Sequence, residues 1–383
     1  MQPSLAPDVA AANDLTRKWC AAAGSGDFVL SGCGVWPLLA LLAPVAAEPT
    51  RTELATAAGV SADSAHPAAR TLLARIEGAD AVRTALGVWV RDGIALDDNW
   101  IRSLPPATVA ALRGRADLDE WAVRHTDGLI DRFPVEIDGS AALAVATAVV
   151  ARTPWTSAFY ADVLEPATGP WRGHRGPALA RYDTALGNAA LLTAETPMTR
   201  VVVRGAADLD VHLLLGPDAP APGTPATVLA AGLDALDGSV ETRPITLAST
   251  GPGLLVREVT AIGDALRVQL PPFDIRSAHD LLEVPALFGL RTATVTTGNR
   301  FPGLSPTPLA LSGAGQHVRA RFTAEGFDAA AVSAVVMAPT GMPPKPTRSI
   351  EVAVSFDRPF GFLAVHRPTG LVIVAGWVAT PGS

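Results

Sequence analysis

The sequence predicts a mixed α+β protein in which helices come first along the chain and strands follow, with a few helices between them. Three observations predict this class. Apolar residues in the first third recur with helical spacing, and short runs rich in valine and leucine dominate the remainder. Helices and strands do not alternate regularly, as they would in a parallel sheet. With 383 residues, the chain is long enough to bury a large core.

The predicted helices lie mainly in the first third of the chain. Asp14, Arg17 and Lys18 lie on the expected solvent face of the first one, and a Thr and a Glu near the start of the third suit a capped helix. The expected helical ranges are Asp8–Ala23, Pro37–Ala47, Thr52–Ala58, Leu118–Phe133 and Ala278–Leu287.

The predicted strands are short and are separated by glycine and proline residues. Their ranges are Ala81–Arg91, Ala142–Ala151, Thr199–Arg204, Asp210–Leu215, Gly253–Glu258, Leu266–Gln269, Val318–Phe322, Ile350–Ser355, Phe360–Val365 and Leu371–Val378. No internal repeat and no low-complexity linker divides the chain.

Composition and charge exclude several classes of protein. A hydrophobic content of 49% with 17% charged residues argues against intrinsic disorder. A net charge of -7 argues against nucleic acid as a partner. The longest apolar stretch, Val35–Ala47, contains two prolines and is too short to cross a bilayer, so we expect no membrane partner. The segment Met1–Asp14 does not resemble a signal peptide, so we expect a cytoplasmic location, with an extracellular one left open.

The two cysteines, Cys20 and Cys33, are too few for a disulfide scaffold or a four-cysteine zinc site. Two buried free thiols are the favoured interpretation, and a single disulfide is the alternative. The chain has 28 arginines and only two lysines, Lys18 and Lys345, a bias that indicates a GC-rich genome.

No local motif predicts catalysis. The sequence lacks the zinc-protease, phosphate-loop, dinucleotide-binding, serine-elbow and Ser-x-x-Lys patterns. A Ser-His-Asp triad that assembles only in space stays open, but nothing local supports one. We therefore expect a protein without enzymatic activity. The dispersed histidines are His66, His125, His174, His212, His279, His317 and His366.

The segment Glu325–Pro344 reads EGFDAAAVSAVVMAPTGMPP and is unusual. It begins with a turn signal, continues with small residues that suit either a helix or a strand, and ends in two prolines that stop regular structure. A plain strand or a surface loop explains it. A segment that is exposed and also has strand character is, alternatively, a candidate conformational switch.

Five blocks in the correct order resemble the serpin family of serine protease inhibitors. The ending is the most specific block, with DRPFGF at Asp357–Phe362, then Thr369-Gly370, Gly376–Val378 and Pro381. The other blocks are similar to family helices and strands, and together the five span essentially the whole chain. They are Phe28–Leu42, Leu118–Ile130, Ala146–Phe159 and Leu270–Leu290. We expect a bacterial member of this family.

The resemblance implies a single domain over residues 1–383, with eight or nine helices, three β-sheets and an exposed reactive loop at about residues 326–344. It implies a reactive bond at Thr340–Gly341 by the family's usual spacing, with Met337–Ala338 as a second candidate. It also implies a hinge before the bond. The hinge residues are Gly326, Phe327, Asp328, Ala329, Ala330, Ala331 and Val332.

The implied function is suicide inhibition. A serine protease attacks the loop, forms an acyl-enzyme, and is trapped when the loop inserts into the central sheet. Such a protein needs no catalytic residue, metal or cofactor of its own, and we expect a monomer. Because Thr340 is small and neutral, elastase- or subtilisin-like proteases are favoured over trypsin-like ones.

Two departures from the family pattern affect this expectation. Phe327 stands where inhibitors carry Thr or Ser, and a bulky ring there would slow insertion, which favours the alternative of a non-inhibitory serpin that acts as a binding protein or a simple protease substrate. The cluster that controls sheet opening keeps Ser31, but Gly34, Thr147 and Gln316 replace a Ser, an Asn and a His.

Other interpretations of this sheet-opening region stay open. The register of the strand favours Gln316 over its neighbour His317. The polar residues are equally explained as ordinary hydrogen-bonded core groups. Trp155, which matches a family position in the same region, is more readily explained as a core residue.

Overall fold

The computed structural model describes residues 5–105, 108–135, 141–217, 224–328 and 346–382. These residues contain seven α-helices and four β-sheets, in agreement with the predicted α+β class. The helices are α1 (Pro7–Ala22), α2 (Gly32–Leu42), α3 (Thr50–Ala58), α4 (Ala62–Glu77), α5 (Asp98–Ser103), α6 (Arg115–His125) and α7 (Thr224–Asp237). Single 3-10 turns follow as η1 (Ala43–Val45), η2 (Leu186–Asn188) and η3 (Leu281–Glu283).

A seven-stranded antiparallel sheet forms the centre of the core. The two strands that come last in the sequence, Phe360–His366 and Leu371–Val378, are buried along their whole length, because helices α1, α2 and α7 pack against them. The strands, in spatial order, are β1 (Phe28–Leu30), β19 (Leu371–Val378), β18 (Phe360–His366), β10 (Leu209–Leu215), β9 (Met198–Arg204), β8 (Ala189–Leu192) and β11 (Thr242–Pro244).

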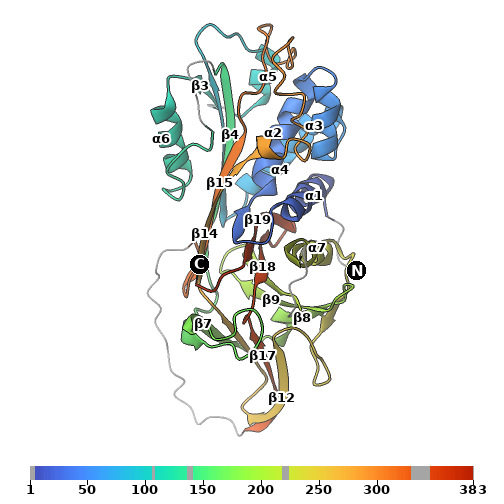
Figure 1. The fold of residues 1–383 in the computed structure, drawn as a ribbon, viewed down its shortest axis with the longest axis vertical. Helices are drawn as coiled ribbons and strands as arrows, with labels where there is room; N and C mark the ends of the chain where they lie inside the picture. Colours follow the sequence, from blue (N-terminus) through green and yellow to red (C-terminus); the bar gives the residue numbers. More distant parts are fainter. Residues whose placement is uncertain (1–4, 106–107, 136–140, 218–223, 329–345, 383) are drawn as a thin grey trace.

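A five-stranded sheet forms the end of the molecule opposite helices α2 to α5 (Figure 1). Its order is β12 (Leu254–Ala261), β17 (Thr347–Ser355), β13 (Ala265–Leu270), β7 (Gly176–Asp183) and β6 (Tyr160–Leu164). Strand β17 lies between β12 and β13, and it pairs antiparallel with β12 and parallel with β13.

Two further β-sheets, of three and four strands, contain long strands of the molecule (Figure 1). One consists of β3 (Val109–Ala111), β2 (Val82–Val90) and β4 (Leu143–Ala151). The other has the order β14 (Phe273–Asp280), β15 (Gly315–Phe322), β16 (Gly326–Phe327) and β5 (Thr153–Pro154). Because β5 follows β4 after a single residue, the two ladders are continuous through the chain, although β4 and β15 do not pair within the described residues.

Most predicted elements are present within a few residues of their expected ends. The second predicted helix begins earlier than expected, at Gly32, because the Ser31 side chain accepts a hydrogen bond from the Gly34 amide and caps it. The fourth ends at His125 instead of Phe133, because Thr126 folds its hydroxyl back onto the carbonyl of Ala122.

The prediction of a helix at Ala278–Leu287 was wrong. The chain there completes strand β14, pairs antiparallel with β15 up to Asp280, and then makes only the short turn η3. Buried and exposed positions alternate from Phe273 to Arg276, which is the pattern of a strand. The helical pattern read from the sequence was weaker than this cross-strand pairing.

The two cysteines are free and buried, as favoured by the sequence. Burial raises the pKa of the Cys20 and Cys33 thiols to about 12. Among the described residues, none of the helices has the length and apolar character needed to cross a membrane.

Candidate functional site

The first two hinge residues form a short strand inside a sheet. Gly326 and Phe327 make up β16, which pairs antiparallel with β15 on one side and with β5 on the other. The turn that reverses the chain is closed by the Thr323 amide, which donates to the Gly326 carbonyl at 3.0 Å. The expectation of an exposed loop from residue 326 onward was therefore wrong for these residues, which are buried.

Phe327 is fully buried, with 0% of its surface exposed. Its ring lies 6.3 Å from the ring of Phe362 on β18, so the side chain points from the sheet into the core. The bulky residue that we expected to slow insertion therefore already occupies an inserted position in the uncleaved chain. Complete burial of a phenylalanine stabilises this position by about 2–3 kcal/mol.

Asp328 is the last described residue of the hinge, and it is also buried. Its amide donates to the Arg321 carbonyl at 2.8 Å, and its carbonyl accepts from Arg152 Nε at 2.7 Å. Its φ of 46° lies in the left-handed region, which Asp and Asn adopt more readily than most residues. The chain therefore leaves the extended conformation of β16 at this residue.

The Asp328 carboxyl is poorly solvated. Its Oδ1 atom has no hydrogen-bond partner among the described residues. Burial raises the pKa of the carboxyl to about 7, although the positive charges of Arg319 and Arg321 act in the opposite direction; the negative charge of Asp274 adds to the rise. Sequence reasoning missed both this burial and the contact with Arg152, because the two residues are 176 positions apart.

The predicted sheet-opening residues come together at the start of α2. Gln316 on β15 makes two hydrogen bonds with the backbone of Ser31, since its Oε1 accepts from the amide at 2.9 Å and its Nε2 donates to the carbonyl at 2.8 Å. The Ser31 hydroxyl donates to the Ile373 carbonyl on β19 at 2.7 Å. Of the two candidates, Gln316 is thus the residue that reaches Ser31.

The opposite strand is tied to the same helix. The Thr147 hydroxyl on β4 donates a hydrogen bond to the Gly34 carbonyl in the first turn of α2. A Cβ atom at Gly34 would lie 3.1 Å from Gln316 Nε2 and 3.2 Å from the Ser31 hydroxyl, so the glycine leaves room for this cluster. One helix end therefore holds both β4 and β15, the two strands that do not pair with each other.

A largely apolar cavity of about 150 Å³ lies along the gap between these strands. Helix α2 borders it on one side and helix α6 on the other, and Figure 1 shows α6 outside the long strands. Its lining includes alternate alanines of β4, at Ala144, Ala146 and Ala148. Small side chains at this edge leave space where a further strand could lie between β4 and β15.

Trp155 lies beside the hinge and has the contacts of a core residue. Its indole Nε1 donates to the Thr323 carbonyl at 3.0 Å, and its amide donates to the Glu325 carbonyl at 2.9 Å. The ring packs 4.7 Å from that of Phe322. Trp155 therefore supports the turn that leads into β16.

The remaining predicted site residues lie outside the described residues. These are the hinge residues Ala329, Ala330, Ala331 and Val332, the expected reactive bond at Thr340–Gly341 and the second candidate at Met337–Ala338. In the part of the chain that the structure describes, no three His, Cys, Asp or Glu side chains are grouped so that they could hold a metal ion.

Comparisons with known proteins agree with this architecture. The family model described as "Serpin (serine protease inhibitor)" matches residues 9–167 and 255–381, which is more than half of the chain. No curated protein sequence matches.

Solved structures give the same fold over nearly the whole chain. Tengpin, a thermophilic serpin in its native state, has a TM-score of 0.74 at 16% identity, covering 99% of this chain and 96% of its own. Human thyroxine-binding globulin complexed with thyroxine has a TM-score of 0.72 at 13% identity, covering 98% of both chains. Native protease nexin-1 with heparin has a TM-score of 0.70 at 16% identity, covering 97% of this chain and 98% of its own.

Proposed function

Because the chain belongs to the serpin family, we propose that it is a serine protease inhibitor that acts as a suicide substrate and has no catalytic activity of its own. The protease cleaves the reactive loop and remains attached to it as an acyl-enzyme. The freed part of the loop then inserts as a new strand between β15 and β4. Displacement of the protease distorts its oxyanion hole, so hydrolysis of the acyl-enzyme stops.

The observation that carries this proposal is the position of the hinge at one end of an unfilled gap. Gly326 and Phe327 already lie between β15 and β5. The next stretch of the gap, between β15 and β4, has no strand pairing across it within the described residues. A strand that continues from β16 would therefore find two unpaired edges and small alanine side chains beneath it.

The hinge sequence suits such a continuation. Side chains alternate between the two faces of a strand, so Ala329 and Ala331 would follow Phe327 toward the buried face at little steric cost. No proline interrupts the segment between Gly326 and Ala338. About fifteen residues at roughly 3.3 Å each would carry the attached protease about 50 Å. A dozen new backbone hydrogen bonds at roughly 1 kcal/mol each would supply about 12 kcal/mol.

The proposed target is an elastase- or subtilisin-like protease, and the proposed reactive bond is Thr340–Gly341, with Met337–Ala338 as the second candidate. A small neutral residue before the cut fits a shallow specificity pocket and offers no charge to an acidic one. We propose that the inhibitor acts as a monomer without a cofactor.

A second candidate function is that of a non-inhibitory serpin, either a binding protein or a simple substrate. The observation that favours it is the hinge itself, where Phe327 is fully buried and Asp328 leaves the extended conformation. Further insertion would require Asp328 to change its backbone conformation. One of the solved structures with this fold is described as a thyroxine-binding globulin in complex with thyroxine, so the fold also occurs in a binding protein.

The deciding experiment is incubation of the protein with subtilisin, elastase, chymotrypsin and trypsin, followed by denaturing gels and sequencing of the released fragment. We expect a band at the summed mass of inhibitor and protease, and a fragment that begins at Gly341. Ala331→Pro serves as the control, because it keeps the cleavage site but blocks strand pairing, and it should give cleavage without the band.

Clean cleavage of the wild-type protein by every protease, without a band at the summed mass, would overturn the inhibitory function and support the second candidate. Cleavage only after an arginine would overturn the proposed protease class alone. The melting temperature after cleavage adds an independent measurement, because an inserted loop stabilises the protein and a loop that stays outside does not.

A further inference from the structure

Arg152 is the single residue between β4 and β5, and its side chain joins two parts of the molecule that lie far apart in the sequence. Its Nε atom donates to the Asp328 carbonyl of the hinge at 2.7 Å. Its Nη1 atom lies 3.2 Å from Oδ2 of Asp127, which comes directly after the residue that caps α6. One guanidinium group therefore contacts both the hinge and the end of helix α6.

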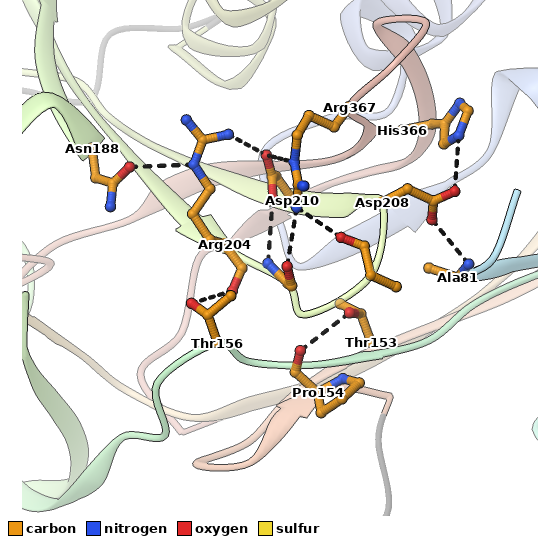
Figure 2. Close-up of polar contacts among 12 residues, drawn as sticks. Ala81, Thr153, Pro154, Thr156, Asn188, Arg204, Asp208, Asp210, His366 and Arg367 are labelled. Atoms are coloured by element: carbon orange, nitrogen blue, oxygen red, sulfur yellow. Dashed lines mark hydrogen bonds and ion pairs between the residues drawn. The ribbon is translucent and has the colours of Figure 1, made fainter. Parts of the chain in front are cut away.

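The backbone around Arg152 is held in place on both sides. The Arg152 amide donates to the Ala81 carbonyl at 2.8 Å, and the Ala81 amide donates to Oδ1 of Asp208 at 3.0 Å (Figure 2). A few residues further along, the Thr156 hydroxyl donates to the Arg204 carbonyl at 3.2 Å, as Figure 2 also shows. The side chain of Arg152, and not its backbone, is therefore the part that can change position.

The turn that carries Asp127 is bonded to the last turn of α6. The Thr126 hydroxyl donates to the Ala122 carbonyl at 2.7 Å and accepts from the Ile130 amide at 3.0 Å. Asp127 itself has a φ of 51°, in the left-handed region that Asp and Asn adopt more readily than most residues. Because these bonds join the turn to the helix, the Asp127 carboxylate moves together with α6.

The strand register indicates what Arg152 does to the hinge. The Asp328 amide donates to the Arg321 carbonyl at 2.8 Å. Residues that form one such bond in an antiparallel pair normally exchange both, so in a continuous strand the Arg321 amide would donate to the Asp328 carbonyl. In the structure that carbonyl accepts from Arg152 instead, and Asp328 has a φ of 46°. Arg152 therefore stabilises the backbone conformation that ends β16.

Helix α6 lies outside the long strands (Figure 1), over the place where an entering strand needs space. It packs on β2 and β4, and its residues Trp121 and Ala122 border the cavity between β4 and β15. A strand that enters there moves β4 and β15 apart by one further strand spacing, about 4.8 Å. The contacts of α6 across the cavity must then change, so the Asp127 carboxylate shifts relative to β4 when the gap opens.

We propose that Arg152 is a positioning residue that couples α6 to the hinge. While α6 covers the gap, Asp127 holds the guanidinium group on the Asp328 carbonyl, and β16 ends there. When α6 moves, Arg152 loses this anchor and releases the carbonyl, which then pairs with the Arg321 amide and lets β16 continue into the gap. This role rests on the proposed function, because it controls the insertion step of the inhibitor.

The first test is amide hydrogen exchange of the Asp328 backbone amide in the uncleaved protein. Arg152→Met keeps the stem and removes the donors, so exchange should become at least about tenfold faster, and Arg152→Lys should restore part of the protection. Asp127→Asn should accelerate exchange about threefold, because it weakens an exposed ion pair, and should add nothing in the Arg152→Met background. Thermal unfolding checks that each variant folds.

Arg83→Met is the matched control. The Arg83 guanidinium group on β2 also contacts the Asp127 carboxylate, at 3.2 Å, and among the described residues it forms no bond with the hinge. Its removal should leave exchange of the Asp328 amide within about twofold of the wild type. Wild-type exchange in Arg152→Met, an equal effect of Arg83→Met, or independent effects of Asp127→Asn and Arg152→Met would overturn the coupling.

The second test measures insertion. After mixing with a protease that is trapped, the change in tryptophan fluorescence in a stopped-flow instrument should be about tenfold faster in Arg152→Met than in the wild type and unchanged in Arg83→Met. An insertion rate in Arg152→Met equal to that of the wild type would overturn control of the insertion step. Absence of trapping in the wild type and in every variant would overturn the proposed function instead, and exchange of the Asp328 amide would then decide on the coupling by itself.

Discussion

The buried carboxyl of Asp328 makes the hinge sensitive to pH, and its replacement by asparagine should reveal this. Asparagine has nearly the same shape, tolerates the left-handed conformation at φ 46°, and cannot ionise. The surrounding charges come from Arg319 and Arg321 on β15 and from Asp274 on β14, and Arg152 contacts only the backbone carbonyl. The variant therefore removes one titration and leaves the neighbouring charges in place.

The direction in which stability changes with pH follows from the direction of the pKa change. The pKa of Asp328 rises from 3.8 to about 7 when the hinge is seated in the sheet. Below pH 3.8 the carboxyl is protonated in both the folded and the unfolded chain, so it contributes no difference. Between these two values the unfolded chain loses its proton and the folded chain keeps it, so the free energy of unfolding falls as the pH rises. Above about pH 7 the loss is complete.

The full loss corresponds to about 4 kcal/mol at 1.36 kcal/mol per pH unit. This loss of stability has an upper limit. The hinge leaves the sheet once ionisation of the Asp328 carboxyl costs more free energy than burial of the hinge contributes. Asp328→Asn should therefore exceed the wild type in stability by up to about 4 kcal/mol at pH 8 and match it near pH 4.

Urea unfolding of both proteins between pH 4 and pH 9 measures this difference, and titrations common to the two cancel. Stability can be lost through global unfolding or through release of the hinge alone. Amide hydrogen exchange at Phe327 and Asp328 distinguishes the two, since only release of the hinge exposes these amides selectively. A difference that stays constant over the whole range would refute the reasoning, because it would mean that the carboxyl does not change protonation on burial.

Three further predictions concern the surroundings of the hinge and the core. Thr147→Val should lower the free energy of unfolding by about 1 kcal/mol, because it removes the hydrogen bond to α2, whereas Thr156→Val, at an exposed hydroxyl, should change it by less than about 0.5 kcal/mol in the same denaturant titration. Cys20 and Cys33 should resist a thiol reagent at pH 8 in the folded protein and react once it is unfolded, since burial holds both pKa values at about 12; a spectrophotometric thiol assay checks this. Phe327→Thr should destabilise the uncleaved protein by about 2–4 kcal/mol, measured by urea unfolding, because it empties a fully buried position.

The sequence predicted those features of the site that depend on short-range pattern. The strand register identified Gln316 instead of His317, because alternation along β15 decides which side chain faces α2. The two free thiols followed from the small number of cysteines and from the usual burial of free cysteine in proteins. The strands were predictable for the same reason, since each carries its own pattern of valine and leucine.

The features that sequence analysis missed depend on residues far apart in the chain. Phe327 is buried because strands β5 and β15 lie on either side of it, and no local pattern indicates their spacing. The same holds for Asp210 and Arg367, which are 157 positions apart and meet only through the pairing of β10 with β18. Local periodicity does not indicate whether a segment is buried by strands that are distant in the sequence. It also does not indicate which distant charged residues form ion pairs.

Phe327 and Asp328 act in opposite directions on the same conformation of the hinge. Burial of the Phe327 ring stabilises the seated hinge by about 2–3 kcal/mol, whereas the ionised Asp328 carboxyl costs up to about 4 kcal/mol above pH 7. The two contributions are similar in size, so each substitution should shift the same equilibrium by a comparable amount. Asp328→Asn should then slow exchange of the backbone amide at position 327 at pH 8, and Phe327→Thr should accelerate exchange of the same backbone amide. Combining the two changes should restore a rate near that of the wild type, because they act on one equilibrium. Addition of the two effects in the double variant would support this view, and exchange that follows only one of them would contradict it.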